Sequence, residues 1–219
     1  MKYKIIIAFS MLTLSGCSTF PIQSYSPQVE NINALSNVQT KLSVTYLPAS
    51  FTDTGVVQCR GAGPVKLING DTFTKYVASS LESELIAGKK YQVSSPKEIK
   101  VRLTRVDFET TLGNTNWYID GKYTLGDSVA YVSTIYNDKS SYMADKACRN
   151  MGVYFPKAVA MHLQQLIASP EFNRFVSVYN QNEHQRFAEK LEILNKAFHN
   201  GVITEQEFED KRAKLISDL

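Results

Sequence analysis

Three cysteines carry the most distinctive chemistry of this 219-residue chain, because a thiol can be acylated, oxidised to a disulfide or bound to a metal. Cys17 follows an apolar run near the N-terminus, whereas Cys59 and Cys148 lie in the body of the chain. Neither a metal site nor a cofactor is expected, because no Cys-x-x-Cys occurs and the histidines lack ligand-like spacing. The histidines are His162, His184 and His199.

The carboxylates suggest no catalytic pair. Asp107 and Glu109 are two residues apart on a predicted strand and therefore share one face of it. We interpret them as an exposed pair rather than an acid/base dyad. The chain contains no Gly-x-Ser-x-Gly elbow, no phosphate-binding loop and no Gly-x-Gly-x-x-Gly motif. We therefore do not expect an enzyme.

The N-terminus has the pattern of a bacterial secretion signal. Two lysines precede the apolar run 5–14, and small residues come just before Cys17. A transmembrane helix is the competing interpretation, but ten helical residues span about 15 Å and a bilayer core needs about 20 residues. A buried helix of the folded domain also fits poorly, because Pro21 and Pro27 follow with no helical pattern.

The segment Leu14-Ser15-Gly16-Cys17 resembles the lipobox of bacterial lipoproteins. The resemblance implies that residues 1–16 are a signal peptide that is removed and that Cys17 becomes an acylated N-terminus, with palmitate among its acyl groups. An aspartate after the cysteine commonly retains such proteins in the inner membrane, so Ser18 implies the outer membrane. The expected location is the cell envelope, lipid-anchored in the outer membrane and facing the periplasm.

Charge and cysteine content agree with this location. Removing residues 1–16 takes away two lysines and no acid, so the formal charge falls from +3 to +1, and nucleic acid is not an expected partner. Cys59 and Cys148 are then an even pair in an oxidising compartment, which favours a disulfide between them. Two unpaired buried thiols are the alternative, because free cysteine packs as a small hydrophobe.

The body of the chain alternates between strand and helix patterns. Period-two alternation predicts a strand over 41–47 and an antiparallel meander over about 99–136, with a bulge after Arg105. Helices are predicted over 72–87, capped by Asp71 and closed by Gly88, over about 152–168, with Pro156 in the first turn, and over 171–179. The predicted fold class is α+β, an antiparallel sheet with two helices packed on one face, followed by a small C-terminal helical hairpin.

Composition divides the chain into segments. Residues 17–40 are rich in Ser, Asn, Gln and Pro and are predicted to be the lipidated N-terminus and a flexible tether. Residues 41–180 are predicted to form the α+β periplasmic domain, residues 181–185 a polar linker and residues 186–219 the hairpin. The element order and the segment Ser-Pro-Glu-Phe-Asn-Arg-Phe resemble small outer-membrane lipoproteins of the YajG type and auxiliary lipoproteins of lipid transporters.

The C-terminal hairpin has the sharpest motif. An apolar stripe occupies one face of its first helix, Gly201 ends that helix, and Thr204 and Glu207 form a capping box, with a hydrophobic staple on either side of it. The expected interaction residues are Phe187, Leu191, Leu194, Phe198, Gly201, Ile203, Thr204, Glu207, Phe208 and Leu215.

The segment Gly201-Val202-Ile203-Thr204-Glu205-Gln206-Glu207-Phe208, followed by Lys211, Lys214 and Leu215, resembles the SHOCT module, a short C-terminal domain of many bacterial proteins. The resemblance implies a non-catalytic hairpin that mediates self-association or binds a protein partner. A plain hairpin that caps the main domain is the alternative.

Two functions follow from these observations. The first is a membrane-anchored interaction or scaffold lipoprotein of the envelope. The second is an accessory lipoprotein that binds a lipid or glycolipid for a transport system. Aromatic strand residues such as Trp117 and Tyr123 bear on the choice, since a filled core between sheet and helices favours the first function and an apolar pocket there favours the second.

Overall fold

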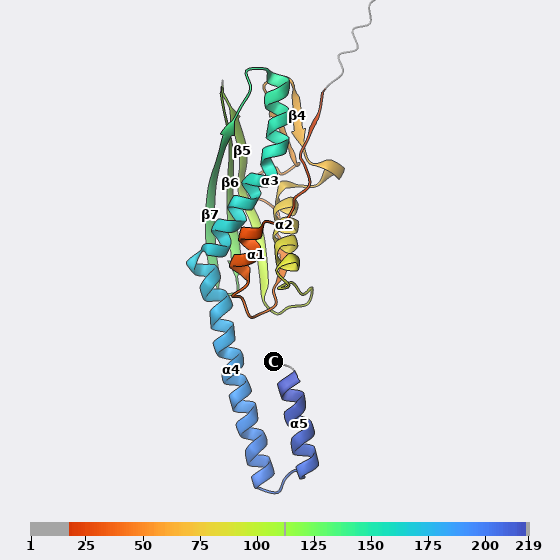
Figure 1. Cartoon of the computed structure of the whole chain (residues 1–219), viewed down its shortest axis with the longest axis vertical. Helices are drawn as coiled ribbons and strands as arrows, with labels where there is room; N and C mark the ends of the chain where they lie inside the picture. The colour runs from red at the N-terminus through yellow and green to blue at the C-terminus, as the bar shows by residue number, and fades with distance from the viewer. Residues whose placement is uncertain (1–17, 112, 218–219) are drawn as a thin grey trace, which may run out of the picture.

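Among the residues that the structure describes, two sheets and three helices form the body of the molecule, and two further helices form an extension (Figure 1). The computed structural model describes residues 18–111 and 113–217, without the side chains of residues 69, 178–186 and 217. The predicted signal peptide, the lipobox and Cys17 lie outside the described residues. The strands are β1 (Phe20–Pro21), β2 (Ser43–Tyr46), β3 (Val56–Cys59), β4 (Gly63–Lys66), β5 (Glu98–Thr110), β6 (Asn114–Leu125) and β7 (Ser128–Lys139). The helices are α1 (Val29–Leu35), α2 (Phe73–Ala87), α3 (Ala144–Ala168), α4 (Pro170–His199) and α5 (Glu205–Ser217), with a 3-10 turn at Ile68–Gly70.

The larger sheet has the strand order β2-β5-β6-β7. The three long strands form the predicted antiparallel meander, and the register shifts between Leu103 and Arg105, immediately before the position predicted for the bulge. The predicted α+β class is confirmed. Two details differ from the prediction: β2 pairs parallel to β5, and a second sheet, β1-β4-β3, covers part of α3.

Helices α2 and α3 pack on one face of the larger sheet, as predicted, and α1 packs on both of them (Figure 1). The space between sheet and helices is filled by aromatic side chains. The ring of Trp117, which is fully buried, lies 4.7 Å from that of Phe155 and 5.2 Å from that of Phe108, and Phe73 packs edge-on to Phe155. The indole N–H of Trp117 donates to the carbonyl of Met151 at 3.1 Å, so its polar atom is also paired.

The start of α2 corrects the predicted cap. Thr72, not Asp71, is the N-cap, and its hydroxyl accepts from the backbone N–H of Lys75 at 3.1 Å. The carboxylate of Asp53 accepts from the N–H groups of Phe73 and Thr74, each at 2.8 Å, so a distant residue completes the cap. Gly88 ends the helix as predicted.

Helix α3 begins eight residues earlier than predicted, and Pro156 lies inside it rather than in its first turn. A proline at this position leaves the carbonyl four residues back without its helical donor. That carbonyl belongs to Gly152, and it accepts instead from the backbone N–H of Gln23 at 3.1 Å. The N-terminal segment therefore supplies the hydrogen bond that makes the internal proline tolerable.

The predicted flexible tether over 17–40 is wrong for residues 18–40. β1 pairs with β4, α1 packs on α2 and α3, and Phe20, Ile22 and Leu35 are buried in the core. The polar composition of residues 18–40 predicted a tether because the apolar residues that enter the core are few and widely spaced. The main domain therefore begins at about Ser18.

Substituting Gly152 by alanine should detach this segment, because an added Cβ would overlap the backbone carbonyl of Pro21. We expect a loss of about 1–3 kcal/mol in the free energy of unfolding, as for other overpacked cores. Chemical denaturation measures the loss, and limited proteolysis between residues 18 and 40 should become faster. Arg149→Ala, an exposed position on the same helix, is the control. Unchanged stability and proteolysis would contradict the docked position of the segment.

A polar cluster lies within the core beside β6. His162 is fully buried on α3, its Nδ1 lies 2.8 Å from the hydroxyl of Thr134, and that hydroxyl also donates to Gln165 at 2.6 Å. The ring of Tyr123 packs against the imidazole. Burial lowers the pKa of His162 from its ordinary value of 6.5 to about 3.

This histidine predicts acid sensitivity. Its pKa is lower in the folded state than in the unfolded state, so the unfolded state binds more protons between these two values and stability falls as the pH falls below about 6.5. We expect the free energy of unfolding to drop by about 2 kcal/mol between pH 7 and pH 5 from this group. Urea titrations at both pH values should show a much smaller drop in His162→Gln. An equal drop in both proteins would contradict the assignment.

Helix α4 runs without a break through residues 181–185. The predicted linker is therefore helical, and the helix predicted over 171–179 is the first part of α4. Ser169 caps it by accepting from Phe172 N–H at 3.2 Å, and Phe172 and Val176 bury their side chains in the main domain. Among the described residues, the helices all fall short of the length and apolarity that crossing a bilayer requires.

Candidate interaction surface

The second half of α4 and α5 form the predicted C-terminal hairpin (Figure 1). Helix α4 ends at a left-handed glycine, Gly201, with φ 68°, where a side chain would be strained. The N–H of Val202 returns to the carbonyl of Ala197 at 2.9 Å, which satisfies one of the last carbonyls of the helix. The turn is therefore built by the Asn-Gly step that the sequence places there.

The predicted capping box is confirmed. The Thr204 hydroxyl oxygen accepts from the backbone N–H of Glu207 at 3.3 Å, and the Glu207 carboxylate accepts from the backbone N–H of Thr204 at 2.9 Å. These hydrogen bonds to Thr204 hold the pKa of the Glu207 carboxyl below its usual range. The start of α5 is therefore fixed by local contacts.

Apolar side chains join the two helices. The rings of Phe198 and Phe208 stack with centroids 4.8 Å apart, and Leu194 is only 8% exposed. The other predicted stripe and hairpin residues, Phe187, Leu191, Ile203 and Leu215, are half-buried. Phe198 and Phe208 thus join the two helices, and several of the other apolar side chains of the hairpin remain partly exposed.

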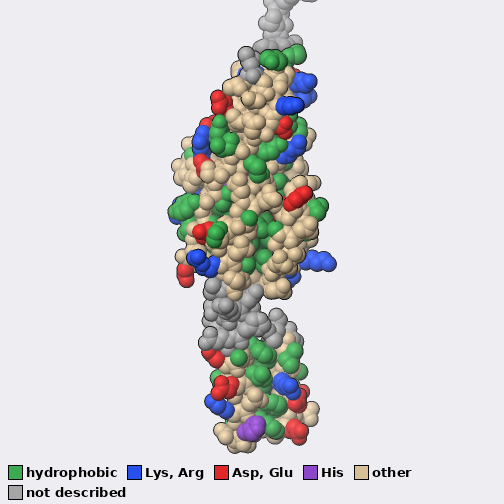
Figure 2. Space-filling model, turned by 60° about the vertical axis from the view of Figure 1, so that its left-hand side comes forward, with side chains coloured by type: hydrophobic (Ala, Val, Ile, Leu, Met, Phe, Trp, Pro, Cys, Tyr) green, Lys and Arg blue, Asp and Glu red, His purple; other side chains and the backbone are tan. Residues whose placement is uncertain are grey.

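An open apolar groove of about 450 Å³ remains between the two helices. It is lined by Lys190, Ile193, Leu194, Ala197, Ile203, Lys211, Lys214 and Leu215. Ile193 is 67% exposed at its edge, and lysines stand around the apolar floor. Figure 2 shows hydrophobic side chains along the hairpin with charged ones around them.

The sequence pattern missed Ile193 and Lys190, whereas Lys211 and Lys214 belong to the segment that resembles the SHOCT module. The predicted stripe followed spacings of three and four residues from Phe187, which selects Leu194 and passes over its neighbour. The sequence did contain a sign of the groove, because Ile193 is an apolar residue next to the stripe. A helix with this wider apolar face has more apolar surface than a single neighbouring helix can cover. The groove is thus a surface of the hairpin as a whole.

Thr204→Ala should weaken the hairpin alone. Losing the hydroxyl cap is expected to cost about 1 kcal/mol of local stability, because the Glu207 N–H loses its acceptor. Hydrogen exchange of the amides of α5 should become faster while exchange in the larger sheet stays unchanged. Thr204→Ser, which keeps the hydroxyl, is the matched control. Equal exchange in both variants would contradict the role of the cap.

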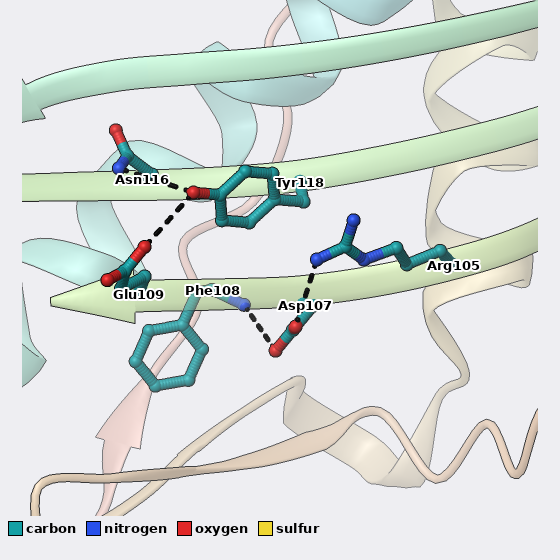
Figure 3. Close-up of polar contacts among 6 residues, drawn as sticks. All are labelled: Arg105, Asp107, Phe108, Glu109, Asn116 and Tyr118. Carbon is teal, nitrogen blue, oxygen red and sulfur yellow. Dashed lines mark hydrogen bonds and ion pairs between the residues drawn. The ribbon is translucent and has the colours of Figure 1, made fainter.

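The carboxylates Asp107 and Glu109 lie on the uncovered face of the larger sheet, as predicted (Figure 3). Asp107 pairs with Arg105 at 3.2 Å, and Glu109 accepts from the hydroxyl of Tyr118 at 3.1 Å. Each carboxylate has its own partner, and both are exposed to solvent. This geometry is that of a solvated sheet face.

The cysteines of the domain form the predicted disulfide. Cys59 at the end of β3 is bonded to Cys148 on α3, with Cα atoms 5.8 Å apart, and both are buried. The bond joins the smaller sheet to the helix layer. Arg60 next to it donates to the carbonyl of Ser141 at 3.1 Å, and its side chain also reaches Thr110 and Thr111 at the tip of the larger sheet.

The histidines and carboxylates form no metal-type cluster of three or more within the part of the chain that the structure describes. His162 is held by Thr134, and His199 lies 2.9 Å from the carbonyl of Asn195. The side chain of His184 is outside the described residues.

Comparisons with known proteins support the fold. No protein-family model and no curated protein matches the chain. The crystal structure of protein XCC0632 from Xanthomonas campestris, described with the family model DUF330, matches with a TM-score of 0.50 and 12% identity, covering 75% of this chain and 99% of that one. A second structure, of an uncharacterised protein, matches with a TM-score of 0.39 and 10% identity, covering 68% and 99%. The chain shares the fold of the Xanthomonas protein. At the level of the fold, this is consistent with the resemblance to YajG-type lipoproteins.

Proposed function

We propose that this chain is a lipid-anchored envelope protein that acts as a non-catalytic interaction module. Acylated Cys17 holds it in the outer membrane on the periplasmic side, and the C-terminal hairpin associates with a protein partner or with a second copy. The observation that carries the association role is the open apolar groove beside Ile193. An apolar surface of this kind on a small protruding hairpin is typical of a protein–protein contact.

The shape of the molecule supports this role. Helix α4 carries the hairpin beyond the main domain (Figure 1), and the groove is lined by residues of α4, α5 and the turn between them. A hairpin of about 30 residues buries too little surface to be stable by itself. Covering the groove with a partner would add the burial that the hairpin lacks.

The second function, binding of a lipid or glycolipid for a transport system, has less support. Its expected site was a pocket between the sheet and the helices, where Trp117, Phe155 and Phe73 pack against one another.

The disulfide of the domain also supports an envelope location, since disulfides persist in oxidising compartments.

Deleting residues 183–219 tests the proposal. The truncated protein keeps Phe172 and Val176, which anchor α4 to the domain, so its thermal transition should change little. Light scattering and affinity capture on soluble forms that start after Cys17 should show loss of self-association or of the captured partner. If mass and partners stay the same, the association role is wrong. If the domain unfolds, the hairpin belongs to the core instead.

A further inference from the structure

The folded domain begins almost at the proposed lipid attachment site. Only Ser18 and Thr19 separate Cys17 from β1, and the carbonyl of Ser18 sits in the space that a side chain on Gly63 would occupy. Gly63 has a φ of 141°, which a residue with a side chain rarely adopts. Ser18 is therefore fixed against β4, and three residues from Cys17 to Phe20 reach at most about 10 Å.

The same end of the domain carries two adjacent, highly exposed apolar residues. Gly63 pairs with Cys59 in the smaller sheet, and the neighbouring Arg60 bonds to the carbonyl of Ser141. Tyr142 and Met143 follow directly, and they are 78% and 71% exposed. Figure 2 shows hydrophobic side chains with basic and acidic ones among them at the end of the domain opposite the hairpin.

We propose that this tip, Tyr142 and Met143, lies in the headgroup layer of the membrane that holds the acylated cysteine. The proposal rests on acylation of Cys17 in the proposed function. A lipid anchor within about 10 Å of β1 keeps this end of the domain close to the headgroups, because the polar layer on each side of a bilayer is several ångströms thick. Tyrosine prefers this layer, since its ring is apolar and its hydroxyl is wet.

The chemistry of the flanking residues suits a phospholipid surface. Lys139 and Lys146 are exposed on either side of the tip, whereas Arg149 is paired with Asp145 at 3.3 Å. Exposed lysines near a membrane are attracted to anionic headgroups. The opposite end of the domain is where α4 leaves, so the membrane contact directs the hairpin away from the bilayer (Figure 1).

A fluorescent label on Met143→Cys tests the proposal in the acylated full-length protein. The native cysteines do not react, because one is acylated and two form the disulfide. The protein is placed on vesicles of phosphatidylethanolamine and phosphatidylglycerol with the environment-sensitive dye NBD at position 143. Quenching by aqueous iodide should be about threefold weaker than at Val202→Cys, which is 73% exposed at the turn of the hairpin and does not line the groove. Brominated lipid should quench only the label at 143.

Tyr142→Cys provides a second label in case Met143→Cys alters the fold, which the thermal transition reports. Equal iodide quenching at the tip and at position 202, with no effect of brominated lipid, would overturn the membrane contact while leaving the anchor intact. The mass of the same preparation reports acylation directly. A protein without acyl groups would overturn both the anchor and this contact, and hairpin association is measured separately by the truncation.

Discussion

The double substitution of Cys59 and Cys148 by alanine is expected to lower the free energy of unfolding of the domain by about 5 kcal/mol. The disulfide closes a loop with a sequence separation of 89 residues, for which the chain-entropy treatment gives roughly 4.5 kcal/mol. Both cysteines are buried between β3 and α3, so replacing them by alanine leaves a cavity that lowers the free energy of unfolding further. Denaturation in urea measures the change.

The reducing agent dithiothreitol gives the matched control for this variant. It should destabilise the wild-type domain by a similar amount and leave the double variant unchanged. A wild-type domain that keeps its full stability after both thiols have been reduced and alkylated would contradict the role assigned to the disulfide.

Ile193→Asp is expected to weaken association through the hairpin by about tenfold or more. Burying an isoleucine side chain stabilises a contact by about 1.5–3 kcal/mol, which corresponds to roughly 10- to 100-fold in affinity. An aspartate in its place would also have to lose water on binding. Because Ile193 is largely exposed at the groove, the hairpin itself should still fold.

Ile216→Asp is the matched control, since Ile216 is also exposed on the hairpin and is not among the residues that line the groove. Sedimentation velocity on soluble forms measures self-association, and affinity capture measures partner binding. Equal loss in both variants would indicate a general charge effect, and no loss in either would remove the groove from the contact.

Regular patterns in the sequence predicted much of the fold. The meander, its bulge, the disulfide and the capping box were all predicted correctly, because each depends on alternation, cysteine parity or spacing within a few residues. All of these features except the disulfide depend on residues that are close in the sequence. The disulfide could be predicted because Cys59 and Cys148 were the only two cysteines left after Cys17 was assigned to the lipid.

The N-terminal segment could not be predicted in the same way. Its role depends on the carbonyl of Gly152, which has no donor within the helix because of Pro156. The backbone N–H of Gln23, more than 120 residues away in the sequence, donates to this carbonyl instead. From the sequence alone, Pro156 predicts that α3 starts just before it, because proline inside a helix leaves a carbonyl without a donor. The hydrogen bond from Gln23 satisfies that carbonyl, so the helix can extend on both sides of Pro156. Asp53, which completes the cap of α2, is a second contact of this long-range kind.

The candidate site was predicted only in part. Of the stripe from Phe187 to Phe198, Phe198 stacks on Phe208 of α5 and Leu194 is buried. Association through these residues stays a prediction. The groove depends on the angle and separation of α4 and α5, which no spacing rule supplies. Ile193 therefore emerged as the most informative position only from the arrangement of the two helices.

Photo-crosslinking from position 193 in native membranes tests directly whether the hairpin associates with a partner. A benzophenone amino acid replaces Ile193 in the full-length protein, and Tyr131, which is exposed on the sheet, serves as the control position. We expect a defined adduct from position 193 and none like it from position 131. Mass spectrometry should identify the adduct as a second copy of the chain or as a single envelope protein. No adduct from position 193, or the same adducts from both positions, would contradict association through the hairpin.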